Sequence, residues 1–134
     1  MKRLLCFAFL ALVGQVTIAQ TQGAAHDAKN IIGTWVGDWS SSRSGGRFEF
    51  EITAFDGASL TGRVNSEAQA CTVGWTALSG KLVGDEIHGT YTIGRPCSRV
   101  QVAFPFPKGH VIEGSWTSEY PGYGTFRLAR KDAP

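Results

Sequence analysis

The sequence predicts an all-β protein that folds as one eight-stranded antiparallel up-and-down β-barrel with one disulfide. Three observations support this prediction. Runs of alternating apolar and polar residues recur between short links rich in glycine, serine and proline, and no window shows helical periodicity. A pattern with two glycines occurs three times at hairpin spacing. Two cysteines fall opposite each other when that pattern sets the register of the strands.

The start of the chain has the pattern of a secretory signal. Two basic residues precede an apolar run that ends in Thr17-Ile18-Ala19, a small-residue cleavage site. The run is shorter than the roughly 20 residues that span a bilayer, and no second run of this kind follows it. We therefore predict a signal peptide at 1–19, a flexible leader at 20–30 and a single barrel domain at 31–134, in a secreted or periplasmic protein without a membrane span.

The charge balance argues against nucleic acids and acidic membrane surfaces as partners. The chain holds 13 lysines and arginines and 11 acidic residues, and two of the basic residues lie in the signal. The mature chain is therefore close to neutral, so it has no net field that would attract a polyanion.

Three segments share one pattern of two glycines, the second five residues after the first. They are FDGASLTGRV at 55–64, LVGDEIHGTY at 82–91 and PKGHVIEGSW at 107–116. Their spacing is typical of successive hairpins, and we expect the first glycine, at 57, 84 and 109, to have a positive φ in a turn of about three residues. The predicted strands are 33–41, 46–55, 59–66, 71–82, 86–94, 98–106, 111–119 and 123–131.

The repeat also predicts which residues face each other, because paired residues of antiparallel strands point the same way. In the first hairpin we pair Phe55 with Ser59. The apolar pairs are then Ala54 with Leu60, Ile52 with Gly62 and Phe50 with Val64, while Glu51 faces Arg63 on the outer surface. In the third hairpin the pairs are Phe106 with Ile112, Phe104 with Gly114 and Val102 with Trp116.

The same rule, transferred to the second hairpin, predicts the disulfide. It places Ala77 opposite Tyr91, Trp75 opposite Ile93 and Cys71 opposite Cys97. Facing residues lie about 4.5–5.5 Å apart, which suits a disulfide, and an exported chain favours one. Lys81 would face the apolar Ile87, so we expect a bulge or fraying near that turn.

The stretch Gly33-Thr34-Trp35 at the start of the first strand resembles the calycin superfamily of lipocalins, fatty-acid-binding proteins and avidins. The resemblance implies that Trp35 plugs one end of the barrel and stacks on a basic residue of the last strand through a cation–π contact. The last strand reads GTFRLARK, so Arg127 and Arg130 are the candidates. Alternation favours Arg130, because its neighbour Leu128 should point inward and Arg127 outward.

An eight-stranded barrel is either filled by its own side chains or encloses one small ligand. The residues predicted to face inward are Trp35, Trp39, Phe48, Phe50, Ile52, Leu60, Val64, Val73, Trp75, Tyr91, Ile93, Val100, Val102, Phe104, Phe106, Ile112, Trp116, Phe126 and Leu128. Either they form a filled core, or an open end stacks a small apolar or aromatic ligand against Trp39, Trp75, Tyr91, Phe104 and Trp116. The inward glycines either leave space for that ligand or make room for large neighbours.

Catalytic and metal sites are not predicted. Glu49 and Glu51 share a strand face that should point to solvent, and His88 falls outside the barrel. His110 stands beside a turn glycine, without a second ligand at metal-binding spacing. No nucleophile-elbow motif occurs. We predict a non-enzymatic protein with no cofactor and no metal.

The partner is therefore predicted to be a small apolar or aromatic molecule, or an extracellular protein. The second alternative is a secreted interaction module, or an inhibitor of an extracellular enzyme, that acts through its hairpin loops. It is supported by the stretches 41–47 and 118–124, which are rich in the Ser, Gly, Tyr and Arg of adaptable contact loops.

Overall fold

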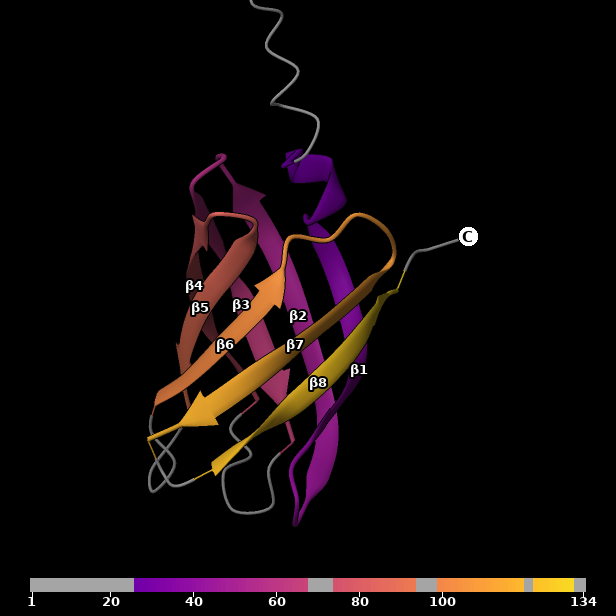
Figure 1. Ribbon diagram of the computed structural model, residues 1–134, viewed down its shortest axis with the longest axis vertical. Helices are drawn as coiled ribbons and strands as arrows, with labels where there is room; N and C mark the ends of the chain where they lie inside the picture. The colour runs from indigo at the N-terminus through magenta and orange to yellow at the C-terminus, as the bar shows by residue number, and fades with distance from the viewer. Residues whose placement is uncertain (1–25, 68–73, 94–98, 120–121, 132–134) are drawn as a thin grey trace, which may run out of the picture.

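The computed structural model describes residues 26–67, 74–93, 99–119 and 122–131, and these form a closed barrel of eight antiparallel strands (Figure 1). Each strand pairs with the next along the chain, and the last returns to pair with the first. The elements are the 3-10 helix η2 (Ala28–Asn30) and the strands β1 (Gly33–Ser40), β2 (Gly45–Phe55), β3 (Ser59–Ser66), β4 (Trp75–Val83), β5 (Glu86–Thr92), β6 (Arg99–Pro105), β7 (Val111–Ser118) and β8 (Gly122–Arg130). The predicted up-and-down barrel is confirmed.

The strand boundaries follow the predicted ranges closely. β3 has the predicted bounds, and the other strands begin and end within two residues of them wherever the residues are described. The predicted start of β4, at 71, lies outside the described residues. We call the end of the barrel that carries η2 and the β2–β3 turn the upper end, and the end with the β1–β2 turn the lower end (Figure 1).

The first hairpin has the predicted register over most of its length and departs from it near the turn. Phe50 pairs with Val64, Glu51 with Arg63 and Ile52 with Gly62, as predicted. The register then shifts by one residue, so that Ala54 pairs with Thr61 and Phe55 with Leu60. The predicted pairs of Ala54 with Leu60 and Phe55 with Ser59 are wrong. Because a one-residue shift reverses the facing of a strand, the bulge turns Phe55 inward, where it packs on Phe106 at 5.2 Å between ring centroids.

The second hairpin differs from the prediction by one residue throughout. Leu78 pairs with Tyr91 and Leu82 with Ile87, in place of the predicted pairs of Ala77 with Tyr91 and Lys81 with Ile87. The turn between the closing pair Val83 and Glu86 holds two residues, the first of which is Gly84 with φ +64°. The predicted three-residue turn is therefore wrong here, and this tighter turn shifts every residue of β4 to the opposite face.

This shift removes the register argument for the disulfide. Cys71 and Cys97 lie outside the described residues, so their pairing stays a prediction. The register from which we derived it is not the one that β4 and β5 adopt. The remaining support is the presence of two cysteines in a chain with an expected export signal.

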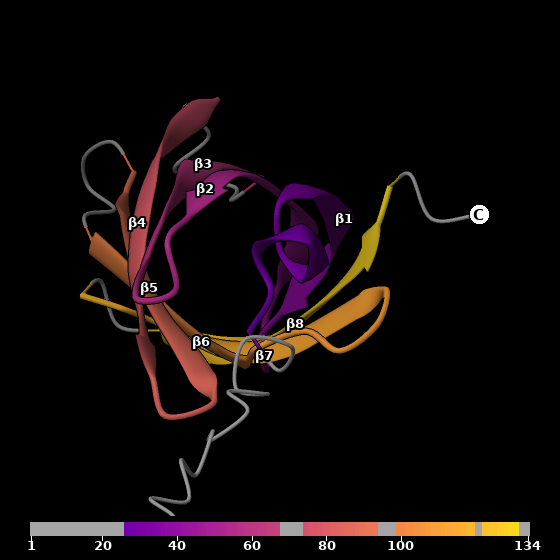
Figure 2. The same cartoon turned by 90° about the horizontal axis from the view of Figure 1, so that it is seen from above.

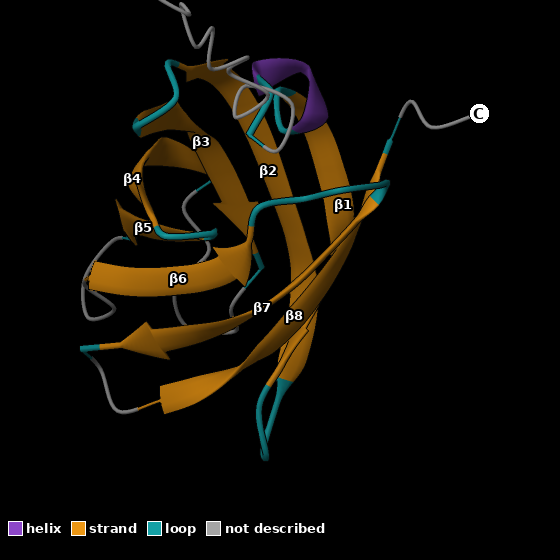
Figure 3. Cartoon of the chain, turned by 45° about the horizontal axis from the view of Figure 1, so that its top comes forward, coloured by secondary structure: helices purple, strands orange, loops and turns teal. Residues whose placement is uncertain are grey.

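The third hairpin keeps the predicted register where its strands pair. Val102 faces Trp116, and the paired part runs from Val100 with Ser118 to Ala103 with Ser115. Toward the upper end β6 and β7 diverge, and a loop over 106–110 joins them (Figure 3). In this wider loop Gly109 does not have the positive φ that we expected, unlike Gly57 and Gly84 in the other two turns.

The middle of the barrel is filled by phenylalanine rings. Phe48, Phe50, Phe104 and Phe126 contact one another with ring centroids 4.7–6.1 Å apart. The other buried residues that were predicted to face inward are Trp35, Ile52, Leu60, Val64, Tyr91, Ile93, Val100, Val102, Phe106, Ile112 and Leu128. Leu78 is also buried, because the shifted register turns this residue of β4 inward, and Ile87 on β5 is buried on the same face as Tyr91. Val73 lies outside the described residues.

The inward glycines mark close approaches of strands. A Cβ on Gly37 would lie 1.9 Å from the carbonyl oxygen of Arg127, and one on Gly62 would lie 2.3 Å from that of Glu51. These positions therefore provide room for neighbouring backbone, as a tightly coiled sheet requires, and not for a ligand.

The leader, predicted to be flexible from 20 to 30, is structured in its described part. Asp27 caps η2 by accepting a hydrogen bond from the Lys29 backbone N–H, and Ile31 after the helix is fully buried. His26 packs edge-on against Phe106 and lies 3.0 Å from the Asp85 carboxylate. Seen from above, η2 lies beside β1, within the outline of the barrel (Figure 2).

Candidate functional site

The upper end is closed by Trp35 and the segment that precedes β1. The Trp35 side chain is fully buried, and its indole N–H donates a hydrogen bond to the Ile31 carbonyl at 2.9 Å. The guanidinium carbon of Arg130 lies 4.4 Å from the centroid of the Trp35 ring. This is the stacking contact that the resemblance implies, made by the arginine that alternation favours. Arg127 points outward instead and forms an ion pair with Glu113.

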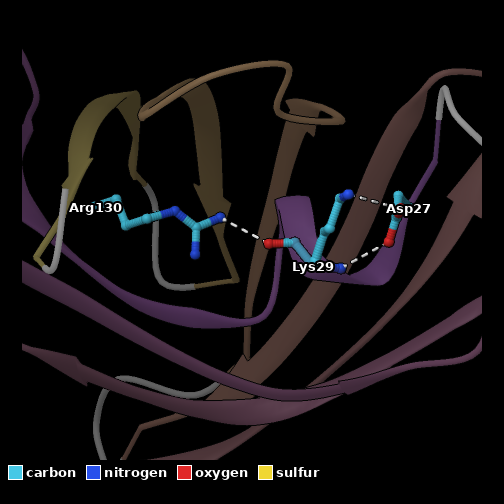
Figure 4. A network of polar contacts seen from close by, with 3 residues as sticks. All are labelled: Asp27, Lys29 and Arg130. Carbon is cyan, nitrogen blue, oxygen red and sulfur yellow. Dashed lines mark hydrogen bonds and ion pairs between the residues drawn. The ribbon is translucent and has the colours of Figure 1, made fainter. Parts of the chain in front are cut away.

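Arg130 also binds the segment around the end of η2. Its guanidinium donates to the carbonyl of Ile32 at 2.7 Å and to that of Asn30 at 2.6 Å. A longer contact of 3.4 Å reaches the Lys29 carbonyl (Figure 4). The last carbonyls of a short helix have no partner within it, so a cation at this position satisfies them. Arg130 thereby holds residues 29–32, which we call the plug segment, on the upper end of the barrel.

The lower end presents two half-buried tryptophans in contact. Trp39 at the end of β1 and Trp116 near the end of β7 pack edge to face, with ring centroids 5.4 Å apart and an interplanar angle of 86°. Both pack against the core, yet neither is buried completely. A Cβ on Gly46 or Gly124 would come within 3 Å of an indole nitrogen of the pair. These two glycines therefore provide the space in which the indoles lie.

The two indoles differ in their hydrogen bonding. Trp39 Nε1 donates to the Glu67 carbonyl at 2.7 Å. Trp116 Nε1 is buried and has no hydrogen-bond partner among the described residues, and the same holds for Thr76 Oγ1 on β4. A buried donor without an acceptor costs about 1–3 kcal/mol, so Trp116 Nε1 is a polar group whose partner the described chain does not supply.

Tyr91 lies on β5 toward the same end. Its side chain is 5% exposed, and it contacts the Phe48 ring at 6.0 Å between centroids. Burial raises the pKa of the Tyr91 hydroxyl, and a smaller opposite effect comes from its hydrogen bond with Ser66. Tyr91 is therefore neutral at physiological pH, and its hydroxyl can donate or accept a hydrogen bond.

Of the five residues predicted to line a ligand site, three lie at the lower end: Trp39, Tyr91 and Trp116. Phe104 is 1% exposed and belongs to the filled middle of the barrel. Trp75 was predicted to face inward, and this is wrong. Its ring lies on the outer face, 37% exposed, with the guanidinium of Arg63 4.4 Å above it.

The outer face around Trp75 forms a short row of paired side chains. Arg63 binds Glu51 at 2.8 Å and stacks on Trp75. The pair of Glu51 and Arg63 is the cross-strand pair that we predicted. Sequence alternation alone could not place Trp75 here, because its facing depends on the length of a turn at the other end of β4.

A concave feature lies on the outer face across β5, β6 and β7. It is a groove of about 350 Å³ whose outward side chains include His88, Thr90, Gln101 and Ser115. His88 is exposed, as predicted, and lies 2.9 Å from Glu86. Within the described residues no group of three or more His, Cys, Asp and Glu side chains could hold a metal ion.

The loop residues favoured by the second interpretation are exposed. Arg43 lies in the β1–β2 turn, and Tyr123 on β8 is 78% exposed. Among the described residues there is no helix with the length and apolarity needed to cross a membrane.

Comparison with known proteins identifies the fold. No protein-family model matches the chain, and no curated protein matches its sequence. Among solved structures, a de novo designed fluorescence-activating β-barrel matches with a TM-score of 0.62 at 14% identity, over 79% of this chain and 98% of that one. The redesigned β-barrel mFAP1 bound to DFHBI matches with a TM-score of 0.60 at 15% identity, over 78% of this chain and 99% of that one.

These similarities and the topology agree on one architecture. The chain has the fold of a small closed β-barrel, with eight antiparallel strands in sequence order. At 14–15% identity the neighbours show the fold alone.

Proposed function

We propose that this chain is an exported, non-enzymatic binding protein that holds a small aromatic ligand at the lower end of its barrel. The observation that supports this most directly is the difference between the two ends. The upper end is closed by Trp35, Arg130 and η2, whereas the lower end presents the half-buried, edge-to-face rings of Trp39 and Trp116. A half-buried aromatic pair at one end of a closed barrel offers ring surface on which a flat molecule can stack.

The filled core limits the size of this ligand. Phenylalanine rings occupy the middle of the barrel directly behind the tryptophan pair, since Trp39 pairs with Phe126 and Phe126 contacts Phe48 and Phe50. The ligand therefore lies shallowly against the lower end and does not thread the barrel. One or two fused rings match the area of two indole faces.

One fold neighbour supports the capacity of this fold to hold a ligand. A redesigned barrel of the same topology was solved with DFHBI bound, so a closed eight-stranded barrel of this size can hold a small molecule. Export rests on the basic and apolar start of the chain, with cleavage after Ala19.

The test is a fluorescence titration of the purified protein with naphthalene as a probe. We expect binding to quench tryptophan emission with saturation, and to weaken at least fivefold when Trp39→Phe removes part of the stacking surface. Trp75→Phe is the matched control, because Trp75 lies on the outer face. The proposal fails if no saturable quenching occurs, or if Trp75→Phe weakens binding as much as Trp39→Phe does.

A second function is favoured by one specific observation, the exposure of two loop-type residues: Tyr123, which is 78% exposed, and Arg43 in the β1–β2 turn. Tyrosine and arginine on loops are typical contacts of protein interfaces. In this alternative the barrel is a solid scaffold for a secreted interaction module or an inhibitor of an extracellular enzyme. It predicts loss of partner binding with Arg43→Ala or Tyr123→Ala and no response to naphthalene.

A further inference from the structure

The groove on the outer face of β5, β6 and β7, which we call the outer groove, is concave and is lined by solvent-accessible polar side chains. Its volume of about 350 Å³ lies within the range of about 300–1,000 Å³ that small-molecule sites occupy. The strands β6 and β7 form the near side of the barrel in Figure 1. The outward side chains that line the outer groove are His88, Thr90, Gln101, Ala103, Ser115 and Thr117.

The register of the strands places three of these side chains in one row across the sheet. Thr90 faces Gln101, and Gln101 faces Thr117. Neighbouring strands lie about 4.8 Å apart, so two hydroxyls and one amide follow one another at short intervals, and each can both donate and accept a hydrogen bond. Beyond Thr117 the row ends at Tyr123 on β8, whose side chain is 78% exposed.

The floor of the outer groove is formed by a small residue in the neighbouring row. Ala103 on β6 faces His88 on one side and Ser115 on the other. Its side chain ends at Cβ, so it leaves a depression between the longer side chains around it. The pairing of β6 with β7 ends at Ala103 and Ser115, and the two strands diverge above this pair.

The outer groove offers hydrogen-bonding groups without a free cation or anion. No lysine, arginine, aspartate or glutamate is among the described residues that line it. Its titratable side chain, His88, lies 2.9 Å from Glu86. Ion pairs occupy the charged residues at its borders: Arg99 with Glu119, and Arg127 with Glu113. A phosphate or carboxylate in the outer groove would therefore lose hydration without gaining a free partner of opposite charge.

We infer from this lining that the outer groove binds a neutral saccharide of one or two pyranose rings. Sugar hydroxyls donate and accept hydrogen bonds, as do the hydroxyls of Thr90 and Thr117 and the amide of Gln101. The exposed Tyr123 ring at the end of the row offers an apolar surface on which the C–H face of a pyranose packs. This site is separate from the lower end of the barrel, so the inference does not depend on the proposed aromatic ligand.

The experiment follows the backbone amide resonances of the protein in a heteronuclear NMR spectrum during titration with cellobiose and with maltose. These two neutral disaccharides contain the same ring and differ in their linkage. We expect at least one of them to give saturable shifts with a dissociation constant on the order of 1 mM, as a few net hydrogen bonds allow. The largest shifts should fall on Thr90, Gln101, Ser115 and Thr117.

A second pair of probes tests whether the ligand is neutral. Methyl glucoside and methyl glucuronide share one ring, and the glucuronide has a carboxylate in place of the hydroxymethyl group. We expect the glucoside to bind more tightly, because the described lining offers no free cation to the carboxylate.

Matched variants assign the shifts to the outer groove. Thr117→Val removes one hydroxyl and keeps a β-branched side chain that suits a strand, so it should weaken disaccharide binding about fivefold. Tyr123→Ala should weaken it as well, through loss of the packing surface. Thr61→Val is the control, because it makes the same change at an exposed position of β3 outside the outer groove. Its affinity should stay within about twofold of that of the unaltered protein.

Four results would overturn the inference: no saturable shift with either disaccharide, shifts centred on another face, equal weakening by Thr117→Val and Thr61→Val, or tighter binding of the glucuronide than of the glucoside. The naphthalene titration tests the proposed function at the lower end. Because the two experiments use different probes and different residues, either hypothesis can fail while the other stands.

Discussion

Arg130 stacks on Trp35 with its guanidinium carbon 4.4 Å from the ring centroid, and the same guanidinium binds the carbonyls of Asn30 and Ile32. One residue of the last strand thus joins the first strand to the segment that precedes it. Removing this side chain would expose one face of the buried indole and leave two carbonyls without a donor. The closed upper end of the barrel therefore depends on a contact between the two ends of the described chain.

Arg130→Ala should lower the free energy of unfolding by about 2–4 kcal/mol, because it removes a cation–π contact and charged hydrogen bonds together. Arg127→Ala is the matched control on the same strand. Its ion pair with Glu113 is exposed, so the loss should be at most about 1 kcal/mol. Urea denaturation of both variants measures the difference. Similar losses would show that Arg130 does not hold the plug.

Gly37→Ala should destabilise the barrel by about 1–3 kcal/mol or more, because the added Cβ would lie 1.9 Å from the Arg127 carbonyl oxygen. Gly109→Ala is the control. A Cβ at Gly109 meets nothing within 4 Å and its φ is not positive, so the change should be within about 1 kcal/mol of neutral. Thermal unfolding followed by circular dichroism compares the two, and a neutral Gly37→Ala would contradict the close approach of β1 and β8.

The buried hydroxyl of Tyr91 should make the free energy of unfolding fall at alkaline pH. Burial raises the pKa of its hydroxyl above that of the unfolded chain. The neutral form is favoured by the fold, so this contribution is complete below the ordinary tyrosine pKa of about 10 and is lost as the pH rises above it. Tyr91→Phe should remove that alkaline dependence. Urea midpoints measured at neutral pH and above pH ~10 for both proteins test this, and parallel pH curves would refute it.

The predicted disulfide between Cys71 and Cys97 closes a loop of about 25 residues, which is worth roughly 3–4 kcal/mol in the chain-entropy model. Reduction should therefore lower the melting temperature by more than about 10 °C. Mass spectrometry after thiol alkylation, with and without reductant, shows whether the sulfurs are bonded. Two free thiols in protein purified from an oxidising compartment would end this prediction.

Much of the fold was predictable because several local signals agree. The alternation of apolar residues indicated eight strands, and turn glycines marked their ends. In the first and third hairpins the repeat also predicted pairs such as Phe50 with Val64 and Val102 with Trp116. The choice of Arg130 over Arg127 beside Trp35 required only the parity of one strand.

The errors share one physical cause. In β2 a bulge reverses the facing of Phe55. The Phe55 ring then packs on Phe106, which stabilises the reversed facing. In the second hairpin a two-residue turn at Gly84 shifts β4 by one residue and turns Trp75 outward. In both places the pairing shifts by one residue, and such a shift exchanges the two faces of a strand.

The sequence alone determined the class of fold, the order and extent of the strands and the aromatic character of the core, because these follow from the period of the apolar residues and the positions of the turns. Only the tertiary structure decided which aromatics share an end, that Trp39 has an acceptor and Trp116 does not, and that Trp75 lies outside. The reason is that periodicity specifies a face within one strand, whereas the closure of eight strands decides how those faces combine.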